Sequence, residues 1–488
     1  MEIFDIKNKR EVLWDMELCD SVSGIRLNMH KPVRKGPVIE CNDPWGGEHC
    51  GYGKIIFDGE KYRFYYRGCG FNAGPWDNSQ GEHAVWCVAY SYDGKHFQKP
   101  ELGIFEYNGS KNNNIVMMRE NNYIDNFSIF VDTNPACPPE KKYKAISGYT
   151  YDWDKRDVGL KVYTSADGLH FEYERDILRG QGMFDSMNTA FWNEDIGKYC
   201  LYMRDYHALD TQNRIEYEKE DHVRDIRITY SDDFVNWTEP KLIDFGEDDK
   251  TEFQLYTNGV MKYYRSDNYV GLATRYIDRT PDEVNYKYLP DINGYRNRII
   301  EKWGRCGSAM TDCIIMTSRD GVGFKRTKEA FFSPGPENGD NWAYGDCYIS
   351  HGIIQTKSDF PGEPDEMSIY TAKGYRARPV SFERYTLRLD GFFSWRAEYS
   401  GGSAVTKPLK FEGDKLSVNF STSAIGYLRI ELLDENGEAI EGYDSGRLFG
   451  DSVDRPVDFA NSLKELEGRA IRMRITMCDC DFYSFAFA

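Results

Sequence analysis

A seven-residue phrase that recurs four times constrains the fold of this chain more than any other feature. It reads Ser-x-Asp-Gly-x-x-Phe at residues 91–97, 165–171 and 318–324, and Ser-x-Asp-Phe-x-x-Trp at residues 231–237. A degraded fifth copy is Arg388-x-Asp390-Gly391-Phe392, with its aromatic residue displaced to Trp395. The Asp-Gly pair favours a hairpin turn, Ser and Asp can bond the nearby backbone, and the aromatic ring can fill the space between neighbouring units.

Each copy follows a short strand-like run, and successive copies begin 66 to 87 residues apart. A repeat of this length, built from strands and turns, indicates the blades of a β-propeller rather than a small solenoid. The alternative is five unrelated hairpins, which four copies with the same Ser-to-aromatic spacing disfavour. We therefore predict an all-β chain with a five-bladed β-propeller over residues 1–396, in which residues 1–40 are a candidate for a strand donated to close the ring.

The pattern changes after residue 396. Short alternating runs at 416–420, 426–433, 470–477 and 482–487 are separated by turn residues, and no further copy of the phrase occurs. Several short strands of this kind predict a C-terminal β-sandwich over residues 397–488. Helix signals are scarce throughout, and the long charged loop 278–305 is either a functional flap or an insertion.

Net charge excludes several classes of partner. The chain carries a formal charge of −18, whereas nucleic-acid binding and attraction to an anionic membrane surface both depend on Lys and Arg. No apolar run approaches the roughly 20 residues that span a bilayer, and the start of the sequence has no basic segment followed by an apolar one, which predicts a cytoplasmic protein. We expect no nucleic-acid or membrane partner and no cofactor or metal centre, with a structural calcium ion and a homo-oligomer left open.

Each predicted blade opens with an acidic residue. Because the innermost strand of every blade lines the central channel, we expect these acids to converge at one mouth. Gathering carboxylates costs free energy unless one is protonated or a ligand is bound, which favours a functional site. Hydrolysis of a glycosidic bond needs such a set, one acid to protonate the leaving oxygen and one carboxylate to attack or to activate water. The alternative for any single acid is a structural cap. The acids are Asp43 or Glu48, Asp125, Asp185, Glu252 and Asp346.

The segment Asn42-Asp43-Pro44-Trp45-Gly46 resembles the nucleophile motif of glycoside hydrolase family 32. That family shares a five-bladed propeller with families 43, 68 and 130 and also carries a C-terminal β-sandwich. Arg204-Asp205 resembles its Arg-Asp-Pro motif, with Tyr206 in place of the proline. The family's Glu-Cys acid motif is absent, because Phe253 follows Glu252.

Nearly the whole chain also resembles a group of bacterial proteins described as glycosyl hydrolases without a firm substrate. The resemblance is carried by short motifs spread along the chain. They are Phe184-Asp185-Ser186-x-Asn188, Asp132-Thr133-Asn134-Pro135, Thr311-Asp312, Ser318-Arg319-Asp320-Gly321, Arg388-x-Asp390-Gly391-Phe392 and Asp481-x-Tyr483-Ser484-Phe485.

By analogy with these families, Asp43 is the expected nucleophile or base, Asp185 the carboxylate that stabilises the transition state, and Glu252 the general acid. The arginines could instead form salt bridges with these acids, and Trp342 could belong to the core between blades. The predicted substrate-binding residues are Trp45, Glu48, Asp125, Arg204, Asp205, Arg227, Arg275, Trp342, Tyr344 and Asp346.

The predicted function is hydrolysis of terminal sugars from a small oligosaccharide by paired carboxylates. The first alternative is an intracellular phosphorylase of the family 130 type, in which the arginines would face phosphate. The second is a sugar-binding propeller without catalytic activity. Aromatic residues make up 15% of the chain, which suits sugar-stacking surfaces and strands alike.

Overall fold

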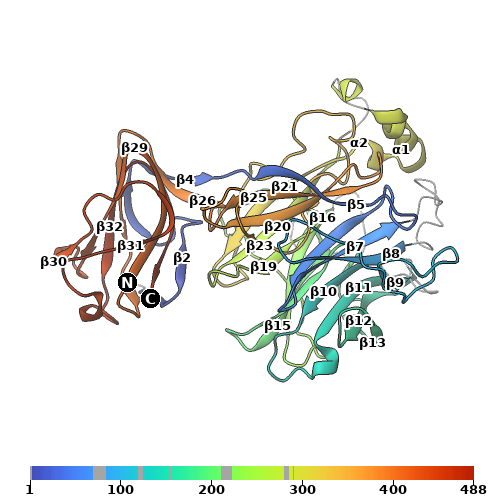
Figure 1. Ribbon diagram of the computed structural model, residues 1–488, viewed down its shortest axis with the longest axis horizontal. Helices are drawn as coiled ribbons and strands as arrows, with labels where there is room; N and C mark the ends of the chain where they lie inside the picture. The colour runs from blue at the N-terminus through green and yellow to red at the C-terminus, as the bar shows by residue number, and fades with distance from the viewer. Residues whose placement is uncertain are drawn as a thin grey trace.

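The computed structural model describes residues 3–69, 84–118, 125–152, 157–209, 222–279, 285–289 and 291–488. Its regular secondary structure is almost entirely β-strand, arranged as a larger unit and a smaller β-rich unit that lie side by side (Figure 1). Among the described residues, no helix is long and apolar enough to cross a membrane.

The larger unit is built from five four-stranded blades, although the innermost strand of the fourth is split in two. Blade 1 contains β6 (Gly51–Phe57), β7 (Tyr62–Cys69), β8 (Ala84–Ser91) and β9 (Ile115–Met118). Blade 2 contains β10 (Asp125–Val131), β11 (Tyr143–Asp152), β12 (Asp157–Ser165) and β13 (Glu172–Ile177). Blade 3 contains β14 (Thr189–Asn193), β15 (Lys198–Ala208), β16 (His222–Ser231) and β17 (Lys241–Leu242). Blade 4 contains β18 (Gln254–Leu255), β19 (Val260–Lys262), β20 (Tyr269–Ile277), β21 (Met310–Ser318) and β22 (Lys325–Arg326). Blade 5 contains β23 (Ile354–Thr356), β24 (Glu366–Lys373), β25 (Ser381–Arg388) and β5 (Val33–Glu40).

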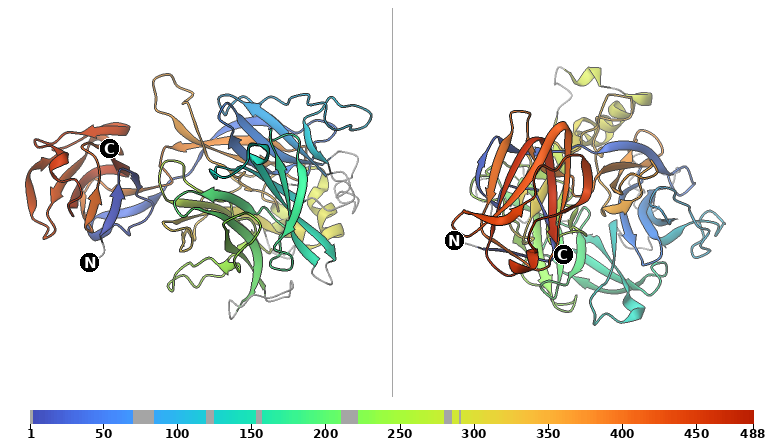
Figure 2. Two further views of the ribbon diagram at one scale, coloured as in Figure 1. Left: turned by 90° about the horizontal axis from the view of Figure 1, so that it is seen from below. Right: turned by 60° about the vertical axis from the view of Figure 1, so that its left-hand side comes forward.

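The innermost strands follow one another around a central axis. β6 lies beside β10, β10 beside β14, and β14 beside β19. Blade 5 returns to blade 1 through two backbone hydrogen bonds of 2.8 Å, from His351 N to Gly53 O and from Ile55 N to His351 O. The strand pairing therefore confirms the predicted five-bladed propeller, seen from two further directions in Figure 2.

An early strand closes the ring, as the sequence suggested. β5 pairs antiparallel with β25 as the outermost strand of blade 5, and its blue ribbon runs beside the orange strands in Figure 1. Blade 5 therefore combines segments that are more than three hundred residues apart in the chain, which stabilises the closed ring.

The repeated phrase forms the turn after the third strand of a blade, away from the channel. In the first copy Ser91 Oγ donates to Asp93 Oδ1 at 2.9 Å, and Gly94 N donates to Ser91 Oγ at 2.9 Å. In three of the turns, the glycine carbonyl also accepts a hydrogen bond from a tyrosine hydroxyl of the preceding blade. The Tyr202 hydroxyl of blade 3, for example, donates to Gly321 O of blade 4 at 2.7 Å. The phrase thus has a structural role, fixing both a turn and the packing of neighbouring blades.

The smaller unit is a sandwich of two layers joined by two long strands. One layer has the order β3, β27, first half of β32, second half of β29 and β30; the other has β4, β26, second half of β32, first half of β29 and β31. Each long strand was expected as two, but an irregularity in their pairing between Thr422 and Tyr427 lets the chain pass from layer to layer without a turn. The strands are β1 (Phe4–Lys7), β2 (Arg10–Val12), β3 (Cys19–Ser23), β4 (Ile25–Met29), β26 (Phe393–Ala397), β27 (Gly402–Thr406), β28 (Leu409–Phe411), β29 (Leu416–Leu433), β30 (Ala439–Asp444), β31 (Asp451–Val457) and β32 (Arg472–Phe487).

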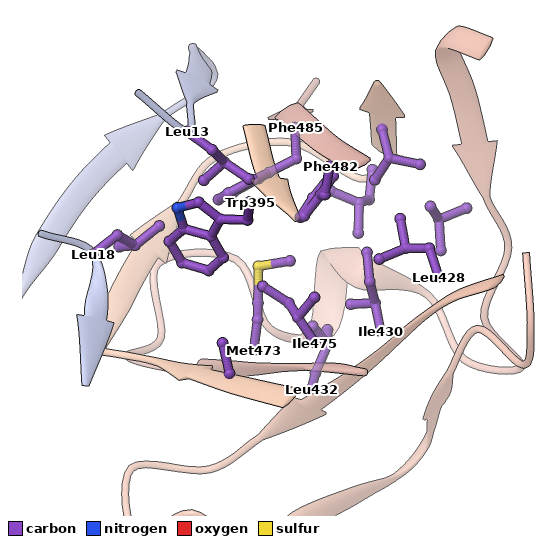
Figure 3. Packing of buried hydrophobic residues seen from close by; sticks show 14 of the residues in the cluster. Leu13, Leu18, Trp395, Leu428, Ile430, Leu432, Met473, Ile475, Phe482 and Phe485 are labelled. Atoms are coloured by element: carbon purple, nitrogen blue, oxygen red, sulfur yellow. The ribbon is translucent and has the colours of Figure 1, made fainter. Parts of the chain in front are cut away.

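The first strands of the chain belong to this second unit. Leu13 and Leu18 pack in one buried cluster with Trp395 and Phe482 (Figure 3). β2, β3 and β4 pair with strands beyond residue 392. We expected the boundary between the two units at residue 396, but the strand pairing places residues 4–29 and 393–396 in the sandwich. These strands belong there because their apolar side chains are buried in the core of the sandwich.

A buried carboxylate joins the two units. Asp390, from the degraded fifth copy of the phrase, is fully buried and accepts hydrogen bonds from Tyr263 Oη at 2.9 Å and Arg265 Nε at 2.8 Å in blade 4. From the sandwich it accepts a hydrogen bond of 2.6 Å from Ser484 Oγ, and its carbonyl accepts one of 2.8 Å from Trp14 Nε1. One side chain therefore couples propeller and sandwich.

The long charged loop contains helices that the sequence pattern did not reveal. The α-helices are α1 (Tyr295–Trp303) and α2 (Arg305–Ser308). Tyr295 and Ile299 are one turn apart and both buried, and they anchor α1. The 3₁₀ turns are η2 (Pro139–Lys141), η3 (Tyr286–Tyr288), η4 (Ile292–Gly294) and η5 (Leu463–Glu465).

Candidate functional site

Tyrosine rings gather where the innermost strands of the propeller begin. We call Tyr52, Tyr256, Tyr344, Tyr348 and Tyr375 the mouth cluster. Its ring centroids lie 5.6 Å apart for Tyr256 and Tyr344, 5.7 Å for Tyr256 and Tyr348, 6.0 Å for Tyr52 and Tyr348, and 6.5 Å for Tyr348 and Tyr375. The Tyr344 hydroxyl donates to that of Tyr256 at 2.6 Å. Residues from blades 1, 4 and 5 thus form one continuous aromatic cluster, in which Tyr256, Tyr344 and Tyr348 are buried and Tyr52 and Tyr375 are partly buried.

Four guanidinium groups lie over rings of this region. Arg67 is 4.7 Å from the Tyr52 centroid and Arg376 is 4.8 Å from that of Tyr344. Arg204 lies 4.9 Å and Arg224 5.9 Å from the ring of Tyr256. Arg204 and Arg224 are 2% and 4% exposed, so the cation–π contacts are made away from water, where they are strongest.

Arg204 positions the predicted carboxylate Asp185. Its Nη1 donates to the Asp185 carbonyl at 2.8 Å and lies 3.6 Å from the carboxylate, which is 46% exposed. Its Nη2 donates to the Tyr206 hydroxyl. Burial lowers the pKa of Arg204, but the neighbouring Tyr206 and Asp185 outweigh this and hold the pKa above its ordinary value. The guanidinium therefore stays charged beside Asp185.

Glu48 is the second predicted acid beside the mouth cluster. Its carbonyl accepts a hydrogen bond of 2.7 Å from the backbone N–H of Arg376. Burial raises the pKa of the Glu48 carboxyl, partly opposed by Arg298, and its Oε2 is buried without a hydrogen-bond partner among the described residues. A carboxyl in this setting holds its proton to a higher pH than an exposed one.

Backbone strain accompanies this arrangement. Tyr52 has φ of 50° and Arg376 has φ of 67°, values that bulky side chains seldom adopt. Such strain is retained where the surrounding structure imposes it, commonly at binding sites. At the mouth it aims a ring of blade 1 and a guanidinium of blade 5 at the same cluster.

The predicted nucleophile Asp43 contacts blade 1 and not the mouth cluster. It forms an ion pair with Lys99, on the segment that leads to the outermost strand of blade 1. The neighbouring Trp45 donates to Asn114 Oδ1 at 2.8 Å and packs on Tyr107, with centroids 6.1 Å apart. The first half of this loop therefore faces the outer part of blade 1, and only its second half, with Glu48, turns to the mouth.

Glu252 lines a cavity of about 120 Å³ between blades 3 and 4, which we call the lateral cavity. Arg224, which lies over the ring of Tyr256, also lines it. Its Oε2 lies 3.2 Å from His207 Nε2, and His207 Nδ1 lies 3.1 Å from Asp225 Oδ2. Burial lowers the pKa of His207, but the hydrogen bonds to Asp225 and Glu252 raise it above its ordinary value. A histidine held between two carboxylates can move a proton to or from Glu252.

Two predicted binding residues are occupied by salt bridges, although not with the three predicted catalytic acids. Arg227 Nη2 donates to Asp225 at 2.8 Å, and its Nε lies 3.3 Å from the buried Asp205. Arg275 donates from Nε and Nη2 to Asp312 at 2.9 and 2.6 Å. These pairs support neighbouring strands of blades 3 and 4.

The remaining predicted residues divide between core, loop and cluster. Asp346 is 2% exposed, burial raises its pKa to about 6, and its carboxylate accepts a 3.0 Å hydrogen bond from Ala343 N. This is the geometry of a loop cap. Trp342 donates from Nε1 to Gly335 O at 2.8 Å. Asp125 begins β10, but its side chain lies outside the described residues. Of this group only Tyr344 joins the mouth cluster.

Sequence reasoning missed Arg67, Arg224 and Arg376. The sequence contains a pattern that could have identified Arg67. Arg67, Arg204 and Arg275 all lie towards the end of the second strand of their blades. Equivalent positions in a propeller face the same end of the channel. Among the described residues, no group of three His, Cys, Asp or Glu side chains is placed to hold a metal ion.

Searches with family models and among curated proteins find no match for the chain. Solved structures give distant similarities. An N-acetylgalactosamine deacetylase from F. plautii, in complex with blood group B trisaccharide, aligns with a TM-score of 0.47 and 12% identity over 75% of this chain and 96% of that chain. A family 43 arabinoxylan arabinofuranohydrolase from Bacillus subtilis gives 0.39 and 13% over 90% and 96%, and a β-1,2-mannobiose phosphorylase from Listeria innocua gives 0.43 and 11% over 74% and 98%. Because all three TM-scores lie below 0.5, the five-bladed fold is assigned from its strand pairing.

Proposed function

We propose that this protein is a glycoside hydrolase that removes terminal sugars from a small oligosaccharide bound at the mouth cluster. The observation that carries the proposal is the combination of aromatic faces, guanidinium groups and carboxylates around one end of the propeller. The half-buried rings of Tyr52 and Tyr375 can stack on the apolar face of a sugar, and the half-buried Arg67 can donate to its hydroxyls. The buried Arg204 and Arg224 support these groups from behind. The carboxyl groups of Asp185 and Glu48 supply the acid–base chemistry that glycosidic hydrolysis requires.

The environments of these two acids support different roles. Glu48 is half-buried with a raised pKa, which suits a general acid that protonates the leaving oxygen. Asp185 is half-exposed and accompanied by the Arg204 guanidinium, which suits a carboxylate that attacks the sugar or activates water. Glu252 remains a second candidate acid, since His207 can return a proton to it. The nucleophile role assigned to Asp43 lacks such support, because its partner is Lys99.

The test compares Glu48→Gln and Asp185→Asn on aryl glycosides with good and poor leaving groups. A variant without its general acid should lose about 10²–10⁴-fold in kcat on poor leaving groups and much less on activated ones. Asp185→Asn should lose activity on both. Glu438→Gln, on an exposed loop of the sandwich, is the matched control. Equal losses on both substrates for Glu48→Gln would remove it from the acid role.

The four guanidinium groups also favour a second function, a phosphorylase that uses phosphate in place of water. Arg204 and Arg224 are buried near one another over Tyr256, and arginine binds phosphate through two parallel hydrogen bonds. Turnover in the presence and absence of inorganic phosphate separates the two reactions. Sugar binding without turnover, unaltered by Asp185→Asn, would instead indicate a propeller without catalytic activity.

A further inference from the structure

A pocket of about 410 Å³ lies apart from the mouth cluster and the lateral cavity. Its walls come from the end of β20 and the start of β21 in blade 4, the segment that contains η3, and the loop that leads into blade 5. None of the mouth tyrosines lines it. Its volume falls in the range of about 300–1,000 Å³ that small-molecule sites occupy. We call it the side pocket; its lining includes Arg275, Asn285, Tyr286, Leu289, Asp312 and Trp342.

Two aromatic side chains of the side pocket are held by their polar ends. Trp342 Nε1 donates to Gly335 O at 2.8 Å, and the Tyr286 hydroxyl donates to Gly307 O at 2.9 Å in α2. The polar atom of each ring is therefore satisfied by the protein, which leaves the faces of the rings for stacking. Trp342 also has φ of 59°, a strained conformation for a bulky residue.

The loop that carries Trp342 is fixed from below. The buried Asn341 donates from Nδ2 to Pro334 O at 3.0 Å and to Pro336 O at 2.7 Å. The carbonyl of Asn341 accepts a 2.6 Å hydrogen bond from Nη2 of Arg296, a buried residue of α1. A ring mounted on such a loop loses little conformational entropy when a ligand stacks on it.

The polar edge of the side pocket is the Arg275–Asp312 pair. The two side chains form a two-bonded fork, and each is 15% exposed. The charges of this pair compensate one another, and Arg279, which also lines the pocket, interacts with another group of the protein. A carboxylate oxygen that already accepts from arginine has a further lone pair for a sugar hydroxyl. Aromatic faces combined with a charge-compensated ion pair match a neutral pyranose or furanose ring.

We propose that the side pocket binds one sugar ring of a neutral oligosaccharide, as a subsite additional to the mouth cluster. The inference rests on the proposed function in taking the substrate to be an oligosaccharide and the mouth cluster to bind one of its rings. Since one ring binds at each place, affinity should increase with glycan length until both are filled.

The experiment measures binding, which does not require turnover. Full-length wild type, Trp342→Ala, Trp342→Phe and the control Tyr399→Ala, an exposed aromatic residue of the sandwich, are applied to an array of neutral glycans. Calorimetry then follows with the longest glycan that wild type binds and with its shorter fragments. Trp342→Ala should weaken binding of the longest glycan about tenfold or more, and should weaken that of the monosaccharide much less. Trp342→Phe should recover most of the loss, and Tyr399→Ala should bind as wild type does.

Two results would contradict the proposal that the side pocket binds a sugar ring. One is that wild type binds no neutral glycan on the array; the other is that folded Trp342→Ala retains wild-type affinity at every length. Length-dependent binding lost in Trp342→Ala, without hydrolysis of any bound glycan, would support the side pocket and count against the proposed hydrolase. If wild type hydrolyses a bound glycan and Trp342→Ala binds glycans of every length with wild-type affinity, the proposed hydrolase is supported and the side-pocket proposal is contradicted.

Discussion

The guanidinium of Arg204 lies 4.9 Å from the ring centroid of Tyr256, so a buried cation of blade 3 rests on an aromatic face of blade 4. The same guanidinium donates to the backbone carbonyl of Asp185 and lies beside its carboxylate. The mouth therefore depends on one planar group that joins two blades and orients an acid.

Replacing Arg204 with lysine should impair function more than stability. A lysine keeps the charge but cannot donate to the Asp185 carbonyl and the Tyr206 hydroxyl at the same time. We expect kcat/KM to fall about 10–100-fold, which corresponds to about 1.4–2.7 kcal/mol. Arg447→Lys is the matched control, because Arg447 is exposed and lies 4.3 Å from the Tyr427 ring in the sandwich. An equal effect of both substitutions would argue against a specific role for Arg204.

Replacing Lys54 with methionine should stabilise the protein near neutral pH. Lys54 is buried at the junction of blades 1 and 5 with His351 Nδ1 as its contact, and burial lowers its pKa from 10.5 to about 7. The unfolded chain binds the proton more tightly, so this lysine destabilises the fold below pH 7, and the cost disappears as pH rises towards 10.5. At pH 7 this cost amounts to about 4 kcal/mol. The contact with His351 that the substitution removes offsets about 1–3 kcal/mol of the gain.

Urea denaturation of wild type and Lys54→Met at neutral and at alkaline pH tests this expectation. The gain of about 1–3 kcal/mol at pH 7 should decline and then reverse as pH approaches 10.5. A variant that is less stable than wild type at both pH values would show that Lys54 has a favourable partner in the folded protein.

His207 should contribute stability that is lost as pH rises. Its pKa is held above the ordinary value by Asp225 and Glu252, so the protonated ring favours the folded state. That contribution is complete below the pKa of unfolded histidine and disappears as pH rises through the folded pKa. The difference in free energy of unfolding between wild type and His207→Asn, followed from mildly acidic to mildly alkaline pH, should therefore shrink. A difference independent of pH would contradict protonation of the ring.

Replacing Asp390 with asparagine should uncouple the two units. Asparagine keeps the size of the side chain but removes the charge that pairs with Arg265, leaving a largely buried guanidinium uncompensated. The expected loss is about 3–5 kcal/mol, and calorimetry should show two transitions where wild type shows one. Asp454→Asn, which removes an exposed carboxylate 3.1 Å from Arg10, should change little. A single unshifted transition for Asp390→Asn would contradict the coupling.

The fold was more predictable than the site because blades repeat local turn chemistry. Each Ser-x-Asp phrase specifies its turn through neighbouring backbone groups, so the copies revealed the blades and their order. Asp185 lies four residues before β14 begins and contacts Arg204 beside the mouth cluster, while its catalytic role stays a prediction. Asp43 instead pairs with Lys99, because the direction of its loop is set by Lys99 and Asn114, which are distant in sequence.

Other differences have similar physical causes. The two long strands of the sandwich were each divided in the prediction, since residues that weaken alternation look like a turn, whereas pairing with the partner strand continues on either side of them. The short helix α1 was not predicted because it has few buried positions. Two of them, Tyr295 and Ile299, pack against residues that are distant in sequence, so the pattern within the helix is too short to recognise.

The strand exchange at both ends of the chain has a consequence for biosynthesis. As the ribosome proceeds, β2, β3 and β4 emerge hundreds of residues before their partners β26, β27 and β32, so they must wait unpaired while the blades form. Blade 5 also waits, because β5 precedes β25 by a similar interval. Nascent chains that stall before β23 should therefore expose the unpaired strands β2 to β5 and depend on chaperones, although four of the five blades are already complete.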